Sequence, residues 1–181
     1  LARQLNGVRD SKLMTPAQRE VWAERIISLA AAHGVGLVGP EEIDRIGILP
    51  ATRLAMRRAI EGLSPSPDHL LIDHLRLPDL ACPQTPITHG DALVLSIAAA
   101  SVLAKVRRDQ VMTALDAQLP GYGFAQHKGY GTQAHQDALA RLGPSPIHRR
   151  SYAPIQRLAA ARPAPADGLA EVPRPGEPPA A

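Results

Sequence analysis

Residues 90–106 read GDALVLSIAAASVLAKV, and this stretch decides what kind of fold the chain can form. After Gly90 it contains no glycine or proline and is rich in small apolar residues. That composition predicts a buried helix with Asp91 at or near its N-terminus. Upstream, residues 69–73 read HLLID, a short apolar run that predicts a buried strand ending at Asp73. One acidic residue therefore ends a strand, and another begins a helix.

Helical and strand patterns alternate along the rest of the chain. Residues 15–18 (TPAQ) have the sequence of a capping box, and they predict a helix that ends near Gly34. Residues 35–38 form a short apolar run that fits a buried strand, and helical patterns follow over 50–62 and 132–142. This alternation predicts the α/β class. In such sheets ligands gather beyond the carboxyl ends of the strands.

Composition limits the classes of protein that the chain can belong to. Its 181 residues suit one domain, which we expect to span 1–158, followed by a disordered Pro/Ala-rich tail over 159–181. The single cysteine, Cys82, excludes an internal disulfide and favours a reducing, cytoplasmic location. No apolar run approaches about 20 residues, so we expect no membrane span. The net charge of +3 suits a polyanionic partner, but equally basic proteins often have none.

The two acidic residues at the element ends are candidates for a metal site. Carboxylates that converge repel each other unless a cation lies between them, and hard cations such as Mg²⁺ and Mn²⁺ favour oxygen ligands. The alternative is structural: Asp91 caps a helix and Asp73 is a turn residue at a strand end, both common positions for aspartate. Spacing alone leaves both interpretations open.

Three polar segments could bind a nucleic acid. Residues 127–132 (HKGYGT) place a cation, a tyrosine and flexible backbone beside a helix start, where Tyr130 can lie against a sugar or base. Residues 10–12 (DSK) place Lys12 near a helix N-terminus, where it can contact a phosphate. Residues 148–151 (HRRS) form a short basic cluster. Each segment is equally compatible with a solvated turn or face. We find no zinc-ligand spacing, dinucleotide fingerprint or nucleophile elbow.

Taken together and in order, several segments resemble ribonuclease HII, the bacterial type 2 ribonuclease H. The resemblance covers roughly residues 5–158. The segments that carry it are DSK (10–12), LLID (70–73), LSIAAASVLAKVRRD (95–109), PGYGFAQHKGYGT (120–132) and LGPSPIHRRSYAP (142–154).

The resemblance implies a fold, an activity and a site. It implies a ribonuclease H-like mixed sheet flanked by helices, with a C-terminal helical extension. Members of the family cut the RNA strand of RNA–DNA hybrids and incise 5′ of single ribonucleotides in duplex DNA, with two divalent ions, Mn²⁺ or Mg²⁺, among four carboxylates. Asp73 resembles the third carboxylate and Asp91 the fourth. Tyr130 resembles the tyrosine that packs on the ribonucleotide and reads its 2′-hydroxyl, and Lys12 resembles a substrate-phosphate contact. We further expect a monomer without a membrane partner.

The chain also departs from the family pattern. Family members carry an Asp-Glu-x-Gly-Arg-Gly motif ahead of the DSK segment, and its acidic residues are the first two metal ligands. The sequence lacks this motif, so we expect an N-terminally truncated chain without the first strand or strands of the sheet. We expect it to be poorly soluble and catalytically inactive or nearly so. A non-catalytic remnant that binds duplexes is the alternative function. His74 stands where a glycine usually follows the aspartate.

Overall fold

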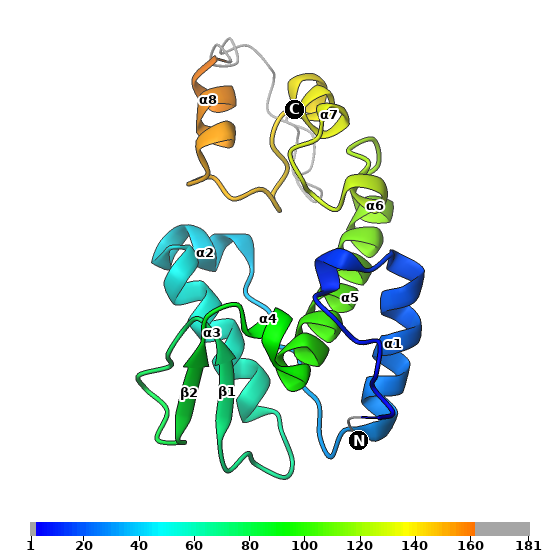
Figure 1. Ribbon diagram of the computed structural model, residues 1–181. Helices are drawn as coiled ribbons and strands as arrows, with labels where there is room; N and C mark the ends of the chain where they lie inside the picture. Colours follow the sequence, from blue (N-terminus) through cyan, green and yellow to red (C-terminus); the bar gives the residue numbers. More distant parts are fainter. Residues whose placement is uncertain (1–2, 162–181) are drawn as a thin grey trace, which may run out of the picture.

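The computed structural model describes residues 3–161 (Figure 1). Within this range the chain is mostly helical and contains one small parallel sheet, which confirms the predicted α/β class. The elements in chain order are the 3₁₀ helix η1 (Ser11–Leu13), α1 (Pro16–Leu29), α2 (Pro40–Ile46), α3 (Ile48–Glu61), β1 (Leu70–Asp73), β2 (Gln84–Ile87), α4 (Gly90–Leu93), α5 (Leu95–Gln118), α6 (Phe124–His127), α7 (Gln133–Leu142) and α8 (Ala153–Ala161).

The sheet confirms one predicted strand and adds another. β1 pairs with β2 in parallel, with Leu70 opposite Gln84 and Asp73 opposite Ile87. The sequence does not predict β2, because its residues QTPI include a proline and show no apolar alternation. Proline lacks an N–H and is tolerated in a strand only where no ladder bond is needed, as at a sheet edge. Pairing with β1, and not a local sequence pattern, therefore makes this segment a strand.

Helix α5 is the central element, with α1 on one side and the sheet with α3 on the other (Figure 1). Ala98, Ala99 and Val102 are buried along it. The prediction of one continuous helix after Asp91 is wrong at Val94, whose extended backbone (φ −125°, ψ 118°) separates the single turn of α4 from α5. Asp91 therefore lies on α4 rather than at the start of the long helix.

The N-terminal helix begins as predicted and ends early. Thr15 and Gln18 form the complete capping box, but α1 stops at Leu29 rather than near Gly34. The strand predicted over 35–38 is absent from the structure: this segment is irregular, and Val35 is 39% exposed. It packs instead on α3. A Cβ on Gly36 would lie 1.8 Å from the carbonyl oxygen of Ala55, so glycine allows this backbone contact.

The C-terminal part, from α6 to α8, has its own core of Tyr122, Phe124, Ala138, Leu139 and Ile155. This part is the helical extension that the resemblance implies. Helix α8 runs to Ala161, so residues 159–161 are helical, and the rest of the predicted tail lies outside the described residues. Over residues 3–161 no helix is both long and apolar enough to cross a membrane.

Asp44, on α2, attaches the C-terminal part to the rest of the chain. Its carboxylate accepts hydrogen bonds from the backbone N–H of Arg150 (2.7 Å) and from the N–H and hydroxyl of Ser151. These bonds, the side-chain bond to Ser151 first, lower the pKa of the Asp44 carboxyl below its ordinary value of 3.8. The contribution of this attachment to stability is therefore full above pH 3.8 and is lost as the pH falls through the lowered pKa.

Replacing Asp44 by alanine is expected to loosen the segment 149–152, because its backbone donors lose their acceptor. The expected result is faster trypsin cleavage after Arg149 and Arg150, measured by mass spectrometry of timed digests at neutral pH. Glu41→Ala, on the same helix, is the control and should cleave at the wild-type rate. Equal cleavage rates for Asp44→Ala and wild type would show that other contacts hold this segment.

Candidate active site

Asp73 and Asp91 come together at one end of the parallel sheet. Asp73 is the last residue of β1, and its Oδ1 accepts a hydrogen bond of 2.9 Å from the backbone N–H of Gly90. Asp91 follows in the first turn of α4, and its Oδ2 lies 3.1 Å from the ammonium of Lys12. The structure therefore brings three of the four predicted site residues to one place, at the carboxyl end of a strand as expected for an α/β sheet.

The backbone at this place is tight. A Cβ on Gly90 would lie 2.6 Å from Cδ1 of Ile97, so this side chain would have to move aside for a larger residue, and 3.5 Å from Cα of Asp73. His74 and His89, the residues that follow Asp73 and precede Gly90, have positive φ angles of 60° and 57°. The left-handed conformation costs energy for any residue with a Cβ, and such residues cluster at functional sites. Glycine suits position 74 because it has no Cβ and adopts this conformation without that cost.

Lys12 offsets part of the negative charge of the acidic pair by its ion pair with Asp91. The hydrogen bond to Asp91, followed by the charges of Asp10 and Asp91, raises the pKa of Lys12 above its ordinary value of 10.5. The ammonium therefore stays charged at neutral pH. Its side chain is 76% exposed, so it can leave Asp91 for solvent or for another anion at little cost.

A buried ion network holds the Lys12 segment against α5, and the sequence analysis missed it. The guanidinium of Arg19 donates to the carbonyls of Ser11 (3.1 Å) and Met14 (2.6 Å) and pairs with Asp109 at 3.1 Å. Lys105 contacts the second oxygen of Asp109 at 2.6 Å. The four-residue spacing of Lys105 and Asp109 on a helix was the one available signal. Nothing local marks Arg19 as buried.

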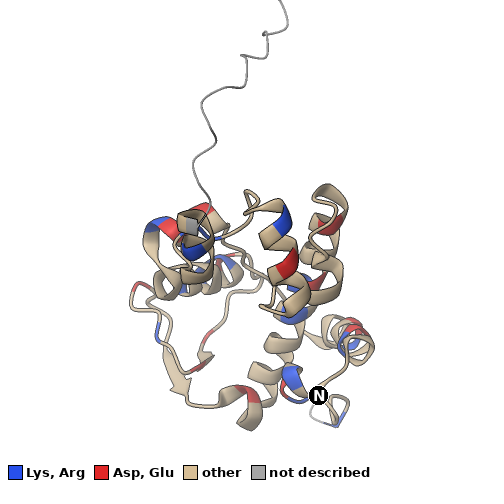
Figure 2. Cartoon of the chain, turned by 90° about the horizontal axis from the view of Figure 1, so that it is seen from above, with Lys and Arg blue, Asp and Glu red and all other residues tan. Residues whose placement is uncertain are grey.

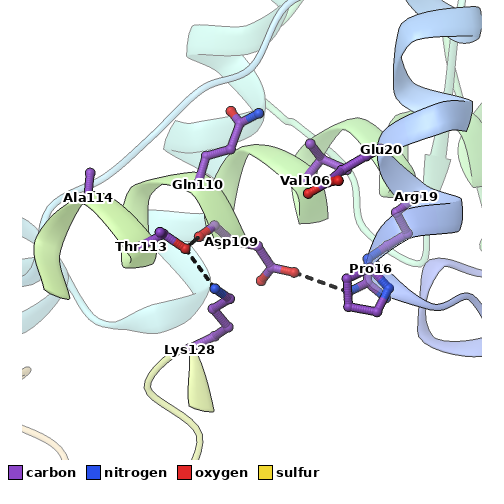
Figure 3. A pocket seen from close by; sticks show the side chains of 9 residues that line it. All are labelled: Pro16, Arg19, Glu20, Val106, Asp109, Gln110, Thr113, Ala114 and Lys128. Carbon is purple, nitrogen blue, oxygen red and sulfur yellow. Dashed lines mark hydrogen bonds and ion pairs between the residues drawn. The ribbon is translucent and has the colours of Figure 1, made fainter. Parts of the chain in front are cut away.

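The same network lines a hollow of about 430 Å³ between α1 and α5 (Figure 3). Arg19 and Asp109 face each other across it, and Lys128 donates to Thr113 at its other end. In this lining Arg19 and Asp109 are therefore paired with each other, whereas Lys128 is bonded to uncharged oxygens. Basic and acidic residues are intermingled over the molecule in Figure 2, so the positive net charge does not by itself define a binding face.

Tyr130 lies in the loop after α6, where its ring is beside Lys105 and Arg108 of α5. The acidic pair lies nearer the N-terminus of α5. The side chain of Tyr130 is 54% exposed, with the ammonium of Lys105 5.2 Å and the guanidinium carbon of Arg108 4.8 Å from the ring centre. Ser11, the neighbour of Lys12, is bonded to Ser101 on the same helix at 2.8 Å. Ser101 and Lys105 are four residues apart, about 6 Å along the axis. Both parts of the candidate site thus lie along helix α5, although within residues 3–161 no hydrogen bond or ion pair joins Tyr130 to Lys12, Asp73 or Asp91.

The ribonuclease HII family model matches residues 3–155. The chain belongs to the ribonuclease HII family. Two ribonucleases HII illustrate the similarity. That of Dehalococcoides mccartyi is 54% identical over 151 residues, which are 83% of this chain and 71% of the relative. That of Desulfitobacterium hafniense is 55% identical over 153 residues, 84% of this chain and 59% of the relative.

A solved structure confirms the fold. The crystal structure of ribonuclease H2 from Pyrococcus horikoshii superposes with a TM-score of 0.69 at 24% identity, covering 88% of this chain and 84% of that one. Enzymes of the ribonuclease HII family are hydrolases that cut the RNA of RNA–DNA hybrids with the help of divalent metal ions. The predicted family, fold class and enzyme class are therefore confirmed.

The acidic pair fits the divalent ions of a ribonuclease HII. Mg²⁺ in nucleotide-processing sites is held through one or two carboxylates, with water and substrate phosphate completing its octahedron. Asp73 and Asp91 supply such hard oxygen donors, and a cationic group, the Lys12 ammonium, already lies against them. Within residues 3–161, no group of three or more His, Cys, Asp or Glu side chains is arranged to hold a metal.

Proposed function

We propose that a protein carrying this ribonuclease HII chain together with the Asp-Glu-x-Gly-Arg-Gly motif incises duplex DNA 5′ of single ribonucleotides, in addition to cutting the RNA strand of RNA–DNA hybrids. Asp73 and Asp91 serve as ligands of Mn²⁺ or Mg²⁺, and Lys12 and Tyr130 bind substrate. The observation that supports this proposal is the convergence of Asp73 and Asp91 beside Lys12 at the end of the sheet. We further propose that the chain acts as a cytoplasmic monomer.

The surroundings of Lys12 and Tyr130 allow the roles proposed for them. In a two-metal hydrolysis, the bound ions activate the attacking water and stabilise the leaving oxygen. Lys12 can turn from Asp91 to a substrate phosphate, because its ammonium is exposed and permanently charged. Tyr130 offers an exposed ring edge to a ribose, and the 2′-hydroxyl is the group that distinguishes RNA from DNA.

Replacing Asp91 by asparagine, in a protein that carries both this chain and the Asp-Glu-x-Gly-Arg-Gly motif, is the direct test. Loss of one negative charge removes a hard ligand, so Mn²⁺-dependent nicking of a duplex with one ribonucleotide is expected to fall below detection. Binding of the same duplex in EDTA, measured by fluorescence anisotropy, is expected to persist. Asp68→Asn, at the exposed opposite end of β1, is the matched control and should nick at the wild-type rate. Undiminished nicking by Asp91→Asn would refute the metal role.

Duplex binding without cleavage is the second candidate function. It is favoured by the ion pair of Lys12 with Asp91, which already neutralises part of the acidic site without a metal. The two candidates differ in one assay on the 181-residue chain. Nicking that increases with Mn²⁺ supports the enzyme, whereas saturable duplex binding with no nicking at any Mn²⁺ concentration supports the binding protein.

A further inference from the structure

Three buried histidines surround the base of the Tyr130 loop. His127, His135 and His148 are 7%, 7% and 9% exposed, and they come from α6, α7 and the segment before α8. The rings of His127 and His135 are stacked, with centroids 4.4 Å apart and planes 15° apart. His135 and His148 are joined by a hydrogen bond of 3.1 Å between their Nε2 atoms. Neither the acidic pair nor the ion network of Arg19 uses these residues.

The hydrogen-bond partners assign every proton in the pair of His135 and His148. The N–H of Ser145 donates to Nδ1 of His148 at 3.0 Å, so this nitrogen carries no proton and the Nε2 of the neutral ring does. Nε2 of His148 therefore donates to Nε2 of His135. The remaining proton of His135 is on Nδ1, which donates to the carbonyl oxygen of Tyr130 at 3.0 Å. Both rings are neutral, and the bonds run in one direction from Ser145 to Tyr130.

His127 binds the other backbone group of Tyr130, its N–H. Its carbonyl accepts the N–H of Tyr130 at 2.9 Å, and its Nδ1 accepts the N–H of Gly129 at 3.2 Å. Its Nε2 then carries the proton and donates to the carbonyl of Tyr122 at 2.7 Å. Both backbone groups of Tyr130 are thus bonded to histidines, while its ring is half exposed between cations of α5.

We infer that His135 and His148 are positioning residues, which hold the Tyr130 ring where it meets the ribonucleotide through a one-way chain of hydrogen bonds between neutral rings. The inference rests on the proposed role of Tyr130 in substrate binding. Short, directed bonds from buried side chains fix a loop more closely than a solvated turn would, and a recognition group displaced by about 1 Å loses much of its effect.

Acid should break this chain. A proton on Nδ1 of His148 would face the N–H of Ser145, and a proton on Nε2 of His135 would face the donor of His148. Burial lowers the pKa of both rings below their ordinary value of 6.5; a neighbouring histidine adds to this for His148, whereas the bond to Tyr130 partly opposes it for His135. The unfolded chain then takes up protons more readily, so this part is fully stable above pH 6.5 and loses stability as the pH falls below it.

The other titratable groups near His135 and His148 are not placed to reverse this loss of stability in acid. Glu41 and Asp44 on α2 share a hollow with His148, but Asp44 is bonded to the backbone beyond it. Other titratable groups near the pair are His127 on α6 and Arg150, which shares the hollow with His148. Three more are bonded elsewhere: Lys128 to Thr113, Tyr122 to the carbonyl of Gly143, and Arg108 to the carbonyl of Lys128.

The test compares binding of two duplexes in EDTA, one with a single ribonucleotide and one all-deoxy. His135→Phe keeps a ring of similar shape but removes the bond to Tyr130, so the preference for the ribonucleotide is expected to fall about five- to tenfold. Tyr130→Ala should remove the preference, and His33→Phe, at an exposed position, should keep it. Thermal unfolding of each variant shows whether the fold persists.

Two further readouts separate positioning from packing. Nitrogen NMR shifts should show the Nδ1–H form of His135 and the Nε2–H form of His148 in the wild type. The preference should decline below pH 6.5 in the wild type, and His148→Gln, which can accept from Ser145 and donate to His135, should retain it with a flatter pH profile.

The outcomes distinguish the two proposals. If Tyr130→Ala removes the preference while His135→Phe keeps it, the positioning role alone is wrong. If Tyr130→Ala leaves the preference unchanged, the proposed role of Tyr130 fails, and the positioning role fails with it. The opposite tautomers in the NMR spectrum would also overturn the inference.

Discussion

Replacing Asp109 by asparagine is expected to lower the free energy of unfolding by about 3–5 kcal/mol, the usual cost of removing one partner from a buried ion pair. Asp109 is the anion between Arg19 and Lys105, and the side chains of Asp109 and Arg19 are 16% and 9% exposed. Without its charge, two cations remain close together and Arg19 is buried without a counter-ion. Urea unfolding followed by circular dichroism measures the loss.

The control for Asp109 is an exposed ion pair in the same chain. Asp79 pairs with Arg57, and its side chain is 67% exposed. Asp79→Asn should therefore cost less than about 1 kcal/mol, because solvent screens the pair. If the Asp109 and Asp79 variants lost equal stability, the network of Arg19 would contribute no more than a surface contact. Because this network also holds the Lys12 segment, Asp109→Asn is further expected to weaken duplex binding before it unfolds the chain.

Replacing Gly36 by alanine should cost about 3 kcal/mol, at the upper end of the range for overpacking a core. The new Cβ would lie 1.8 Å from the carbonyl oxygen of Ala55 and 2.8 Å from the nitrogen of Ala59. Both are backbone atoms of α3, so no side chain can move aside, and the segment 35–38 must separate from the helix. The same urea titration measures the effect.

Gly39→Ala is the matched control for Gly36, three residues away. A Cβ there meets nothing within 4 Å, and the backbone φ of −75° suits any residue. Alanine reduces the entropy of the unfolded chain but is a poorer N-cap of α2, so the net change should be below about 1 kcal/mol. A small loss for Gly36→Ala as well would mean that the contact of this segment with α3 is loose.

Short sequence patterns predicted those structural elements that interactions between near neighbours in the chain stabilise. The capping box at Thr15 and Gln18 forms because its two hydrogen bonds join residues three apart. Asp73 was placed correctly at the end of its strand, since its apolar run is visible in the sequence, whereas the break at Val94 that puts Asp91 in a separate turn is not. The strand predicted over 35–38 failed for the opposite reason. Its apolar side chains are not buried, since Val35 and Leu37 are exposed, and its glycines instead permit contact with the backbone of a helix.

The sequence by itself determined the family, the α/β class and the identity of the residues proposed for the site, because these depend on motifs and on hydrophobic periods within short windows. Only the tertiary structure decided what holds those residues. Ser11 reaches Ser101 and Arg19 reaches Asp109 across 90 positions, and Asp44 reaches Ser151 across 107. The neutral state of His135 and His148 depends on burial and on a donor at Ser145. Such bonds leave no periodic pattern in the sequence, because residues this far apart along the chain come close together only after the chain has folded.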